Sequence, residues 1–195
     1  MRPGLYQRLL EEYSRQFQIS ERLEKFKPKS FIMVDSGSNV HVVFDKQELI
    51  NITDSSWSIS QLEGGLYTTC TGHLNINTLG LDKNGNWCLC LIDSGNVDAG
   101  LTPLASKPLF SAQCVEAQGH ASVEHGNAPG LYLHRSVVEK TTVSFIPYVR
   151  DPAPGGFHYL PIFPRPSDDL AFYSPSQRSI HVDLSEPIKS SSFVR

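Results

Sequence analysis

The sequence has few residues that could form disulfides or bind a metal ion. Among 195 residues there are four cysteines, and they show neither Cys-x-x-Cys spacing nor a Cys/His run like that of a zinc knuckle or finger. The seven histidines include no His-x-x-x-His pair. The sequence therefore predicts reduced thiols, no metal site and no cofactor. The cysteines are Cys70, Cys88, Cys90 and Cys114.

Long apolar runs and an excess of charge are also missing. Nowhere do about 18 apolar residues stand together, and no apolar run follows the first charged residues. A net charge of -3 argues against a general nucleic-acid coat protein. We therefore expect a soluble, cytoplasmic protein without a membrane partner and without direct nucleic-acid binding.

What the chain does contain is enough apolar material for a core. The hydrophobic fraction is 39%, which suits one compact domain with extensions. From Gly4 to Phe26, apolar residues recur at helical spacing, and Pro28 disfavours helix at the residue before it. This pattern predicts an amphipathic helix that ends by Lys27 and packs on its own domain. The apolar stripe is Leu5, Leu9, Tyr13 and Phe17.

The most informative stretch is Phe31 to Val43. Four apolar residues run directly into Asp35-Ser36-Gly37, and a second apolar run begins at Val40. This predicts a buried strand, a tight turn and another strand. The simplest interpretation is a turn, because Asp and Ser bond their own backbone and Gly accepts positive φ. The apolar residues on both sides nevertheless place the Asp35 carboxylate at the edge of the core. A charge there is costly unless the carboxylate is paired or takes part in chemistry.

The flanking residues give this turn a second interpretation. An apolar triplet, Asp35-Ser36-Gly37, Ser38 and a His six positions after the Asp resemble the active-site strand of copia-type retrotransposon aspartic proteases. Ser38 stands where that family usually has Ala. The resemblance implies a mainly β, retropepsin-like closed sheet with a flap hairpin and one short helix. It implies that Asp35 is catalytic and that Ser36 and Gly37 support its carboxylate.

Two hairpins are predicted after this strand. Alternating apolar residues flank Glu63-Gly64-Gly65 between Trp57 and Gly72, and in the resemblance this hairpin is the flap, with Gly64 and Gly65 as its hinge. A purely structural hairpin suits the same pattern. The dipeptide Asn84-Gly85 predicts a second hairpin with a type I′ turn.

The motif Asp-Ser-Gly occurs again at Asp93-Ser94-Gly95. Two catalytic motifs would imply a two-lobed enzyme, but the interval from Asp35 to Asp93 is too short for a flap and a closing helix. We therefore interpret the second motif as a turn that ends a strand. Residues 104–119 are predicted to be the closing helix, with Pro108 in its first turn and Gly119 at its C-cap.

The resemblance extends from about Ser30 to Leu133. Leu109-Phe110-Ser111 and Gly119 fit the family's pattern around the closing helix, and Gly130-Leu131-Tyr132 is similar to the segment that follows copia proteases. Residues 142–146 suit a strand, but six prolines between 147 and 166 preclude long regular elements, so we expect an extended, partly ordered tail to Arg195. The predicted organisation is a helical extension over 1–28, a protease domain over 29–135 and a Pro-rich extension over 136–195.

One Asp in each chain leads to a functional hypothesis. Aspartic proteases need two carboxylates that share one proton, so Asp35 of a second copy must supply the other. The expected function is a homodimeric aspartic endopeptidase acting on a peptide or polyprotein, in the cytoplasm or inside virus-like particles. Two alternatives stay open. One is an inactive, domesticated binding or dimerisation module, and the other is a β-rich viral capsid or structural protein.

Overall fold

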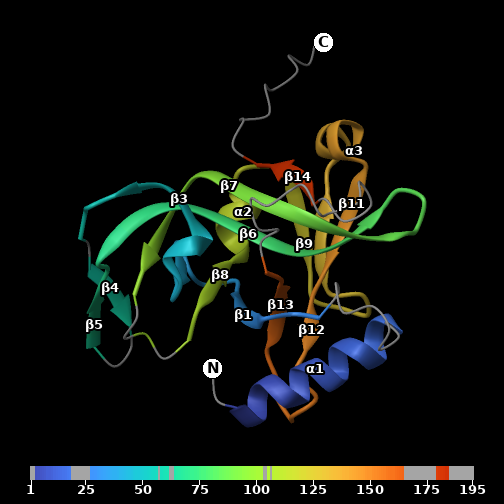
Figure 1. Ribbon diagram of the computed structural model, residues 1–195, viewed down its shortest axis with the longest axis horizontal. Helices are drawn as coiled ribbons and strands as arrows, with labels where there is room; N and C mark the ends of the chain where they lie inside the picture. The colour runs from blue at the N-terminus through green and yellow to red at the C-terminus, as the bar shows by residue number, and fades with distance from the viewer. Residues whose placement is uncertain are drawn as a thin grey trace.

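The computed structural model describes residues 3–18, 27–56, 58–61, 64–102, 105, 107–164 and 179–184. The fold is mainly β (Figure 1). The helices are α1 (Pro3–Phe17), α2 (Ala112–Ala117) and α3 (Arg135–Thr141), with a short 3-10 turn η2 (Lys46–Glu48). The strands of the first half are β1 (Ser30–Asp35), β2 (His41–Val43), β3 (Leu49–Thr53), β4 (Ser58–Gln61), β5 (Gly64–Tyr67), β6 (Cys70–Asp82) and β7 (Trp87–Leu101). Those of the second half are β8 (Leu109–Ser111), β9 (Ala121–Glu124), β10 (Gly130–Leu133), β11 (Val143–Pro147), β12 (Val149–Arg150), β13 (His158–Ile162) and β14 (Ile180–Asp183).

Most of the described strands belong to one sheet. Its order is β12-β13-β1-β8-β2-β7-β6-β11-β10-β9, with β14 beside β7 and β3 beside β6. The long strands β6 and β7 form a ribbon that crosses the molecule, and the small β4-β5 sheet lies at one end of it (Figure 1). No described helix is both long enough and apolar enough to span a bilayer.

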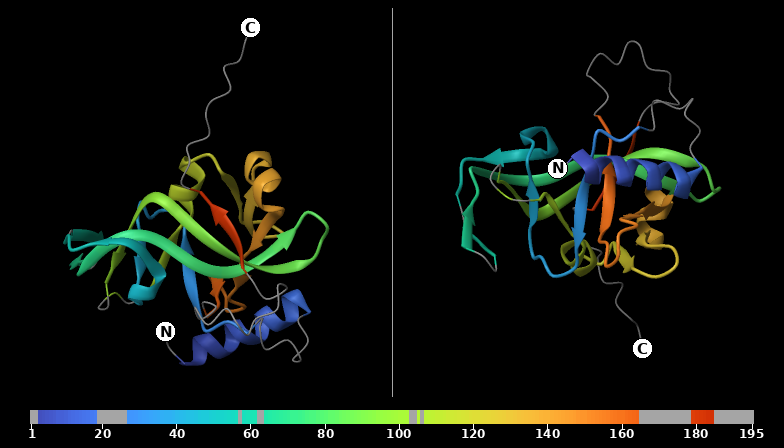
Figure 2. Two further views of the ribbon diagram at one scale, coloured as in Figure 1. Left: turned by 45° about the horizontal axis from the view of Figure 1, so that its top comes forward. Right: turned by 90° about the horizontal axis from the view of Figure 1, so that it is seen from below.

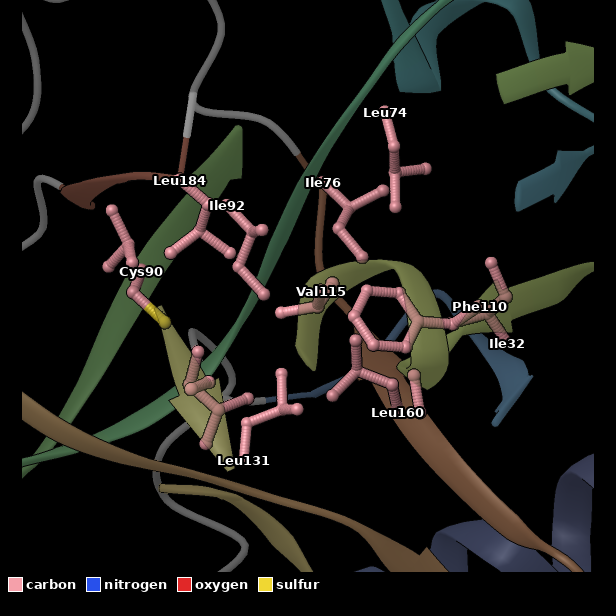
Figure 3. Packing of buried hydrophobic residues seen from close by; sticks show 14 of the residues in the cluster. Ile32, Leu74, Ile76, Cys90, Ile92, Phe110, Val115, Leu131, Leu160 and Leu184 are labelled. Carbon is pink, nitrogen blue, oxygen red and sulfur yellow. The ribbon is translucent and has the colours of Figure 1, made fainter. Parts of the chain in front are cut away.

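The main core lies where β1, β8, β13 and α2 meet the β6-β7 ribbon. Phe110 lies among Ile32, Val115 and Leu160, while Cys90, Ile92 and Leu184 gather farther along β7 (Figure 3). All of these side chains are buried. Because Ile32 and Phe110 come from the two strands that meet at Asp35, the core fixes the strands that carry the candidate site.

Helix α1 covers a second core cluster. Leu9, Tyr13 and Phe17 are buried against Phe31 of β1 and Phe163, and Leu5 is half-buried at the edge. Figure 2 (right) shows α1 lying along the side of the sheet that carries β1 and β13. The predicted stripe and its packing on the same domain are confirmed, although α1 ends at Phe17, and residues 19–26 of the predicted helix lie outside the described residues.

The strand suggested over residues 142–146 is present as β11, but the prediction of an extended C-terminal tail is wrong for the described residues beyond 147. Strand β11 joins β6, β13 pairs antiparallel with β1, and β14 pairs in parallel with β7. Pro161 is compatible with β13 because β12 pairs only with His158 and Tyr159, so among the described strands Pro161, opposite Phe31 of β1, has a partner on one side only. Among the aromatic residues of this segment, Tyr159 and Phe163 are buried and Phe157 is exposed. Phe172 and Tyr173 lie outside the described residues.

Two turn predictions also need correction. The hairpin between β6 and β7 is present, but only Gly85 has positive φ, at +81°, so the turn is not type I′. Gly85 N–H donates to Asp82 O, and Asp82 N–H donates to Asn86 O, which makes a three-residue loop with Gly85 in the left-handed position. The main-chain N–H groups of Asn84 and Asn86 donate to Oδ1 of Asp82 and hold its carboxylate in the loop.

Asp93-Ser94-Gly95 does not end a strand. It lies within β7, where the register with β6 shifts between His73 and Asn75. Gly95 takes a φ of +61°, and its N–H donates to Asp93 Oδ1 at 2.9 Å. Buried Ser94 accepts the N–H of Leu74 at 3.0 Å. The motif is therefore an irregularity inside a paired strand. Backbone N–H and C=O groups that would face water in a free turn are hydrogen-bonded here by β6 and by the Ser94 hydroxyl.

Candidate active site

Asp35 lies at the carboxyl end of β1 and is half-buried, while the next residues, Ser36 and Gly37, are exposed. The main-chain N–H of Gly37 donates to Asp35 Oδ1 at 2.8 Å. This contact makes an Asx turn. Of the two predicted supports, Gly37 thus contacts the Asp35 carboxylate through its main chain, and Ser36 is an exposed neighbour in the sequence.

The loop that follows Asp35 is held by strand β8. Strand β8 lies between β1 and β2 and pairs in parallel with β1, so that Asp35 is opposite Ser111. Strands β1 and β2 are connected by the loop of residues 36–40, which we call the Asp35 loop. Because β8 pairs with both strands that enter and leave this loop, the two ends of the loop are fixed relative to each other.

Ser111 makes three contacts at this junction. Its hydroxyl donates to the main-chain carbonyl of Ser38 in the Asp35 loop and accepts the N–H of Cys114, as the N-cap of α2. Its own N–H donates to Nδ1 of His41 at 3.0 Å. Ser38 Oγ in turn bonds the backbone of Val40, with Oγ donating to Val40 O at 2.6 Å. The loop is therefore tied at Gly37, Ser38 and Val40.

His41 is completely buried at the base of the loop. Its ring lies 5.1 Å from the ring of Phe110, centroid to centroid, and burial lowers the pKa of its imidazole to about 3. Because Nδ1 accepts a hydrogen bond, the neutral ring carries its proton on Nε2. Nε2 is buried and finds no partner among the described residues. His41 is thus a neutral structural acceptor and not a general base.

The predicted closing helix is shorter than expected. Residues 109–111 form β8 instead of helix, and α2 begins at Ala112. Pro108 lies before the strand, where its carbonyl accepts the N–H of Met33 at 3.1 Å. Gly119 has a φ of +75° and follows the end of α2, as expected for a helix terminator. The Ser that precedes the helix was the available signal, since Ser is a preferred N-cap.

The hairpin predicted between Trp57 and Gly72 is present as a separate two-stranded sheet. In it, β4 and β5 pair antiparallel, with Gly64 opposite Gln61 and Gly65 opposite Ser60. Gly64 and Gly65 therefore begin the second strand, and residues 62 and 63 lie outside the described residues. The side chain at the end of the hairpin, Tyr67, is 70% exposed.

A pocket of about 260 Å³ lies at the opposite end of β1 from Asp35. Lys29, Asp45 and Glu48 are among its lining residues, and Lys29 Nζ lies 3.3 Å from Asp45 Oδ2 and 3.5 Å from Glu48 Oε1. These three charges balance one another in part, and the pocket contains no residue of the Asp35 loop.

In the part of the chain that the structure describes, no three His, Cys, Asp or Glu side chains form a group suited to a metal ion.

The two Asp-Ser-Gly motifs share one local geometry in different surroundings. In both, the N–H of the glycine donates to Oδ1 of the aspartate. Asp93, however, lies beside β14, with Oδ2 3.8 Å from His181 Nε2, and its side chain is only 17% exposed. Asp35 is the one of the two that precedes an exposed loop.

Comparisons with family models, curated proteins and solved structures find no match to this chain.

Proposed function

We propose that this protein is an aspartic endopeptidase in which Asp35 of two copies forms the catalytic pair. The observation that carries the proposal is the placement of Asp35 at the end of a buried strand, before an exposed loop whose two ends are paired to the same strand, β8. Such a loop presents a carboxylate in a fixed position to a second molecule. The resemblance of residues 34–41 to copia-type proteases supports the same assignment.

The chemistry follows from two carboxylates at close range. Like charges a few ångströms apart cannot both ionise, so the pair holds one proton between the two groups. The ionised aspartate takes a proton from water as the water attacks the scissile carbonyl, and the protonated aspartate donates a hydrogen bond to the carbonyl oxygen. Each chain supplies one Asp35, at the end of β1 and before an exposed loop, so a twofold axis through the pair completes the proposed site.

The β4-β5 hairpin is the proposed cover for a bound peptide. It forms its own small sheet outside the main sheet, which leaves it free of the strand pairing that fixes β1, β2 and β8. A peptide or a segment of a polyprotein is the proposed substrate.

The test is cleavage of a peptide library by the wild type, Asp35→Asn and Asp93→Asn, with products identified by mass spectrometry. The two variants are matched, because Asn keeps an Oδ1 that can accept the glycine N–H in either motif. Asp35→Asn should abolish cleavage while the fold, measured by circular dichroism, is unchanged, since an amide is not a base toward water. Asp93→Asn should cleave like the wild type. Cleavage that survives Asp35→Asn would refute the proposal, and a wild type inert between pH 3 and 7 would favour the non-catalytic module.

A further inference from the structure

A buried histidine lies beneath the Asp35 loop and takes no part in the proposed chemistry. His41 has no exposed surface, accepts one hydrogen bond at Nδ1 and leaves Nε2–H without an acceptor among the described residues. An unsatisfied buried donor costs about 1–3 kcal/mol, so an apolar side chain would be preferred here if packing were its only role.

The bond that His41 does make is well placed to order the loop. Ser111 is both the register partner of Asp35 and the residue whose hydroxyl bonds Ser38 in the Asp35 loop. The His41 ring fixes the Ser111 N–H from the other side at 3.0 Å. A continuous series of contacts therefore runs from the imidazole through Ser111 to the main chain of the loop.

We propose that His41 is a positioning residue for Asp35, acting through Ser111 to hold the Asp35 loop in one conformation. The inference rests on the proposed function only for its catalytic consequence, because the ordering of the loop can be measured without any substrate. The ring must be neutral, since a protonated Nδ1 donates and can no longer accept the Ser111 N–H.

The surroundings of His41 keep it neutral. It pairs with Ala99 of β7, and its neighbour Val42 pairs with Leu109 of β8, while Phe110 lies against its ring. Burial is the sole cause of its lowered pKa, so no charged group on these packed strands contributes. Nδ1 of His41 therefore remains able to accept the Ser111 N–H at the mildly acidic pH at which the Asp35 pair is expected to work.

The test compares His41→Asn with His41→Leu in the full chain. Asn places a carbonyl oxygen near the position of Nδ1, whereas Leu fills the space and offers no acceptor. By amide hydrogen exchange measured with NMR, His41→Leu should lose protection at Gly37 and Ser111 by at least about tenfold, and His41→Asn should keep it. His181→Leu, the same change on a half-exposed side chain, is the control and should exchange like the wild type.

Kinetics supply the second readout. His41→Leu should lose about 10²-fold in kcat, the order expected when a reacting group shifts by about an ångström, with KM changed little. His41→Asn should recover most of that loss. If His41→Leu does not fold, Ser111→Ala replaces it, because this variant keeps the bond to His41 but cuts the hydroxyl link to Ser38, and Ser111→Thr is its rescue.

The outcomes separate the two proposals. Lost protection in a protein that never cleaves peptides supports the positioning role and refutes the protease function. Normal protection and normal kcat in His41→Leu, or in Ser111→Ala if the former does not fold, would overturn the positioning role and leave the protease function standing.

Discussion

Asp35 and Ser111 are register partners in the parallel strands β1 and β8, so the candidate catalytic carboxylate is aligned with the residue that caps α2. The relationship connects β1 with β8 and the adjoining α2, which lie far from β1 in the sequence. It means that the position of Asp35 depends on β8 and α2 as much as on its own turn. The predictions below therefore test the supporting structure as well as the carboxylate.

The first prediction concerns stability in acid. His41 has a pKa of about 3 in the folded state against 6.5 in an exposed chain, so between these values the unfolded state binds more protons. The free energy of unfolding should therefore fall as the pH drops below 6.5, by up to roughly 5 kcal/mol at pH 3 from this group alone. Urea unfolding of the wild type and of His41→Asn at several pH values from 7 to 4 measures the effect.

The variant isolates the contribution of His41. All other titrating groups are common to both proteins, so the difference between the two stability curves reports the imidazole. His41→Asn should be less stable than the wild type at pH 7, because it leaves space in the core, and the gap should shrink as the pH falls. Parallel curves would show that His41 is exposed or hydrogen-bonded in solution in some other way.

The second prediction concerns helix α1. Leu9 is fully buried under this helix, so Leu9→Ala should cost about 2–5 kcal/mol in the free energy of unfolding. Gln7→Ala, on the exposed face of the same helix, should change it by less than about 0.5 kcal/mol. Denaturant titrations compare the two. Equal small effects would mean that α1 is a detachable extension and not part of the core.

How far the sequence predicts this fold depends on the range of the interactions involved. The strand before Asp35, the α1 stripe and the hairpin at Gly85 follow from local patterns of apolar residues and glycine, and all three are present. Strands β13 and β14 were missed because prolines dominate the local composition of this segment. Their partners, β1 and β7, lie about 90 to 130 residues away in the sequence, and such pairing leaves no local signal.

The candidate site shows the same difference between local patterns, which the sequence reveals, and long-range contacts, which it does not. Asp35, Ser36 and Gly37 are adjacent in sequence and could be assigned from the motif. The link from His41 through Ser111 to Ser38 spans 73 residues and needed the strand order β1-β8-β2 to become visible. The error at Asp93 has the reverse cause, because a sequence that makes a turn when isolated was absorbed into β7 by its pairing with β6.

The third prediction is a pH profile for peptide cleavage. Activity should follow a bell with an acidic optimum, because the pair of Asp35 carboxylates works only while it holds a single proton. Initial rates on a fixed peptide from pH 3 to 8 give the profile, and a rate that rises steadily toward alkaline pH would rule out the carboxylate pair.

The last prediction is that cleavage requires association of two chains. An isolated Asp35 has no second carboxylate with which to share a proton, so the monomer should be inert. Specific activity should rise with protein concentration through the dimer dissociation constant and then level off. Sedimentation over the same concentrations should show the dimer forming in step with activity.

A mixture of chains tests the same point more sharply. Asp35→Asn protein, inactive by itself, should inhibit the wild type when added in excess, because a mixed dimer holds only one competent carboxylate. If chains exchange freely, a ninefold excess leaves about one wild-type chain in ten paired with another wild-type chain, so activity should fall about tenfold. Labelled subunits verify the exchange, and Asp93→Asn in the same excess is the control that should not inhibit. A protein that stays monomeric at every concentration and still cleaves peptides would need its second carboxylate within one chain, and Asp93, whose glycine contact matches that of Asp35, would then be the first residue to substitute.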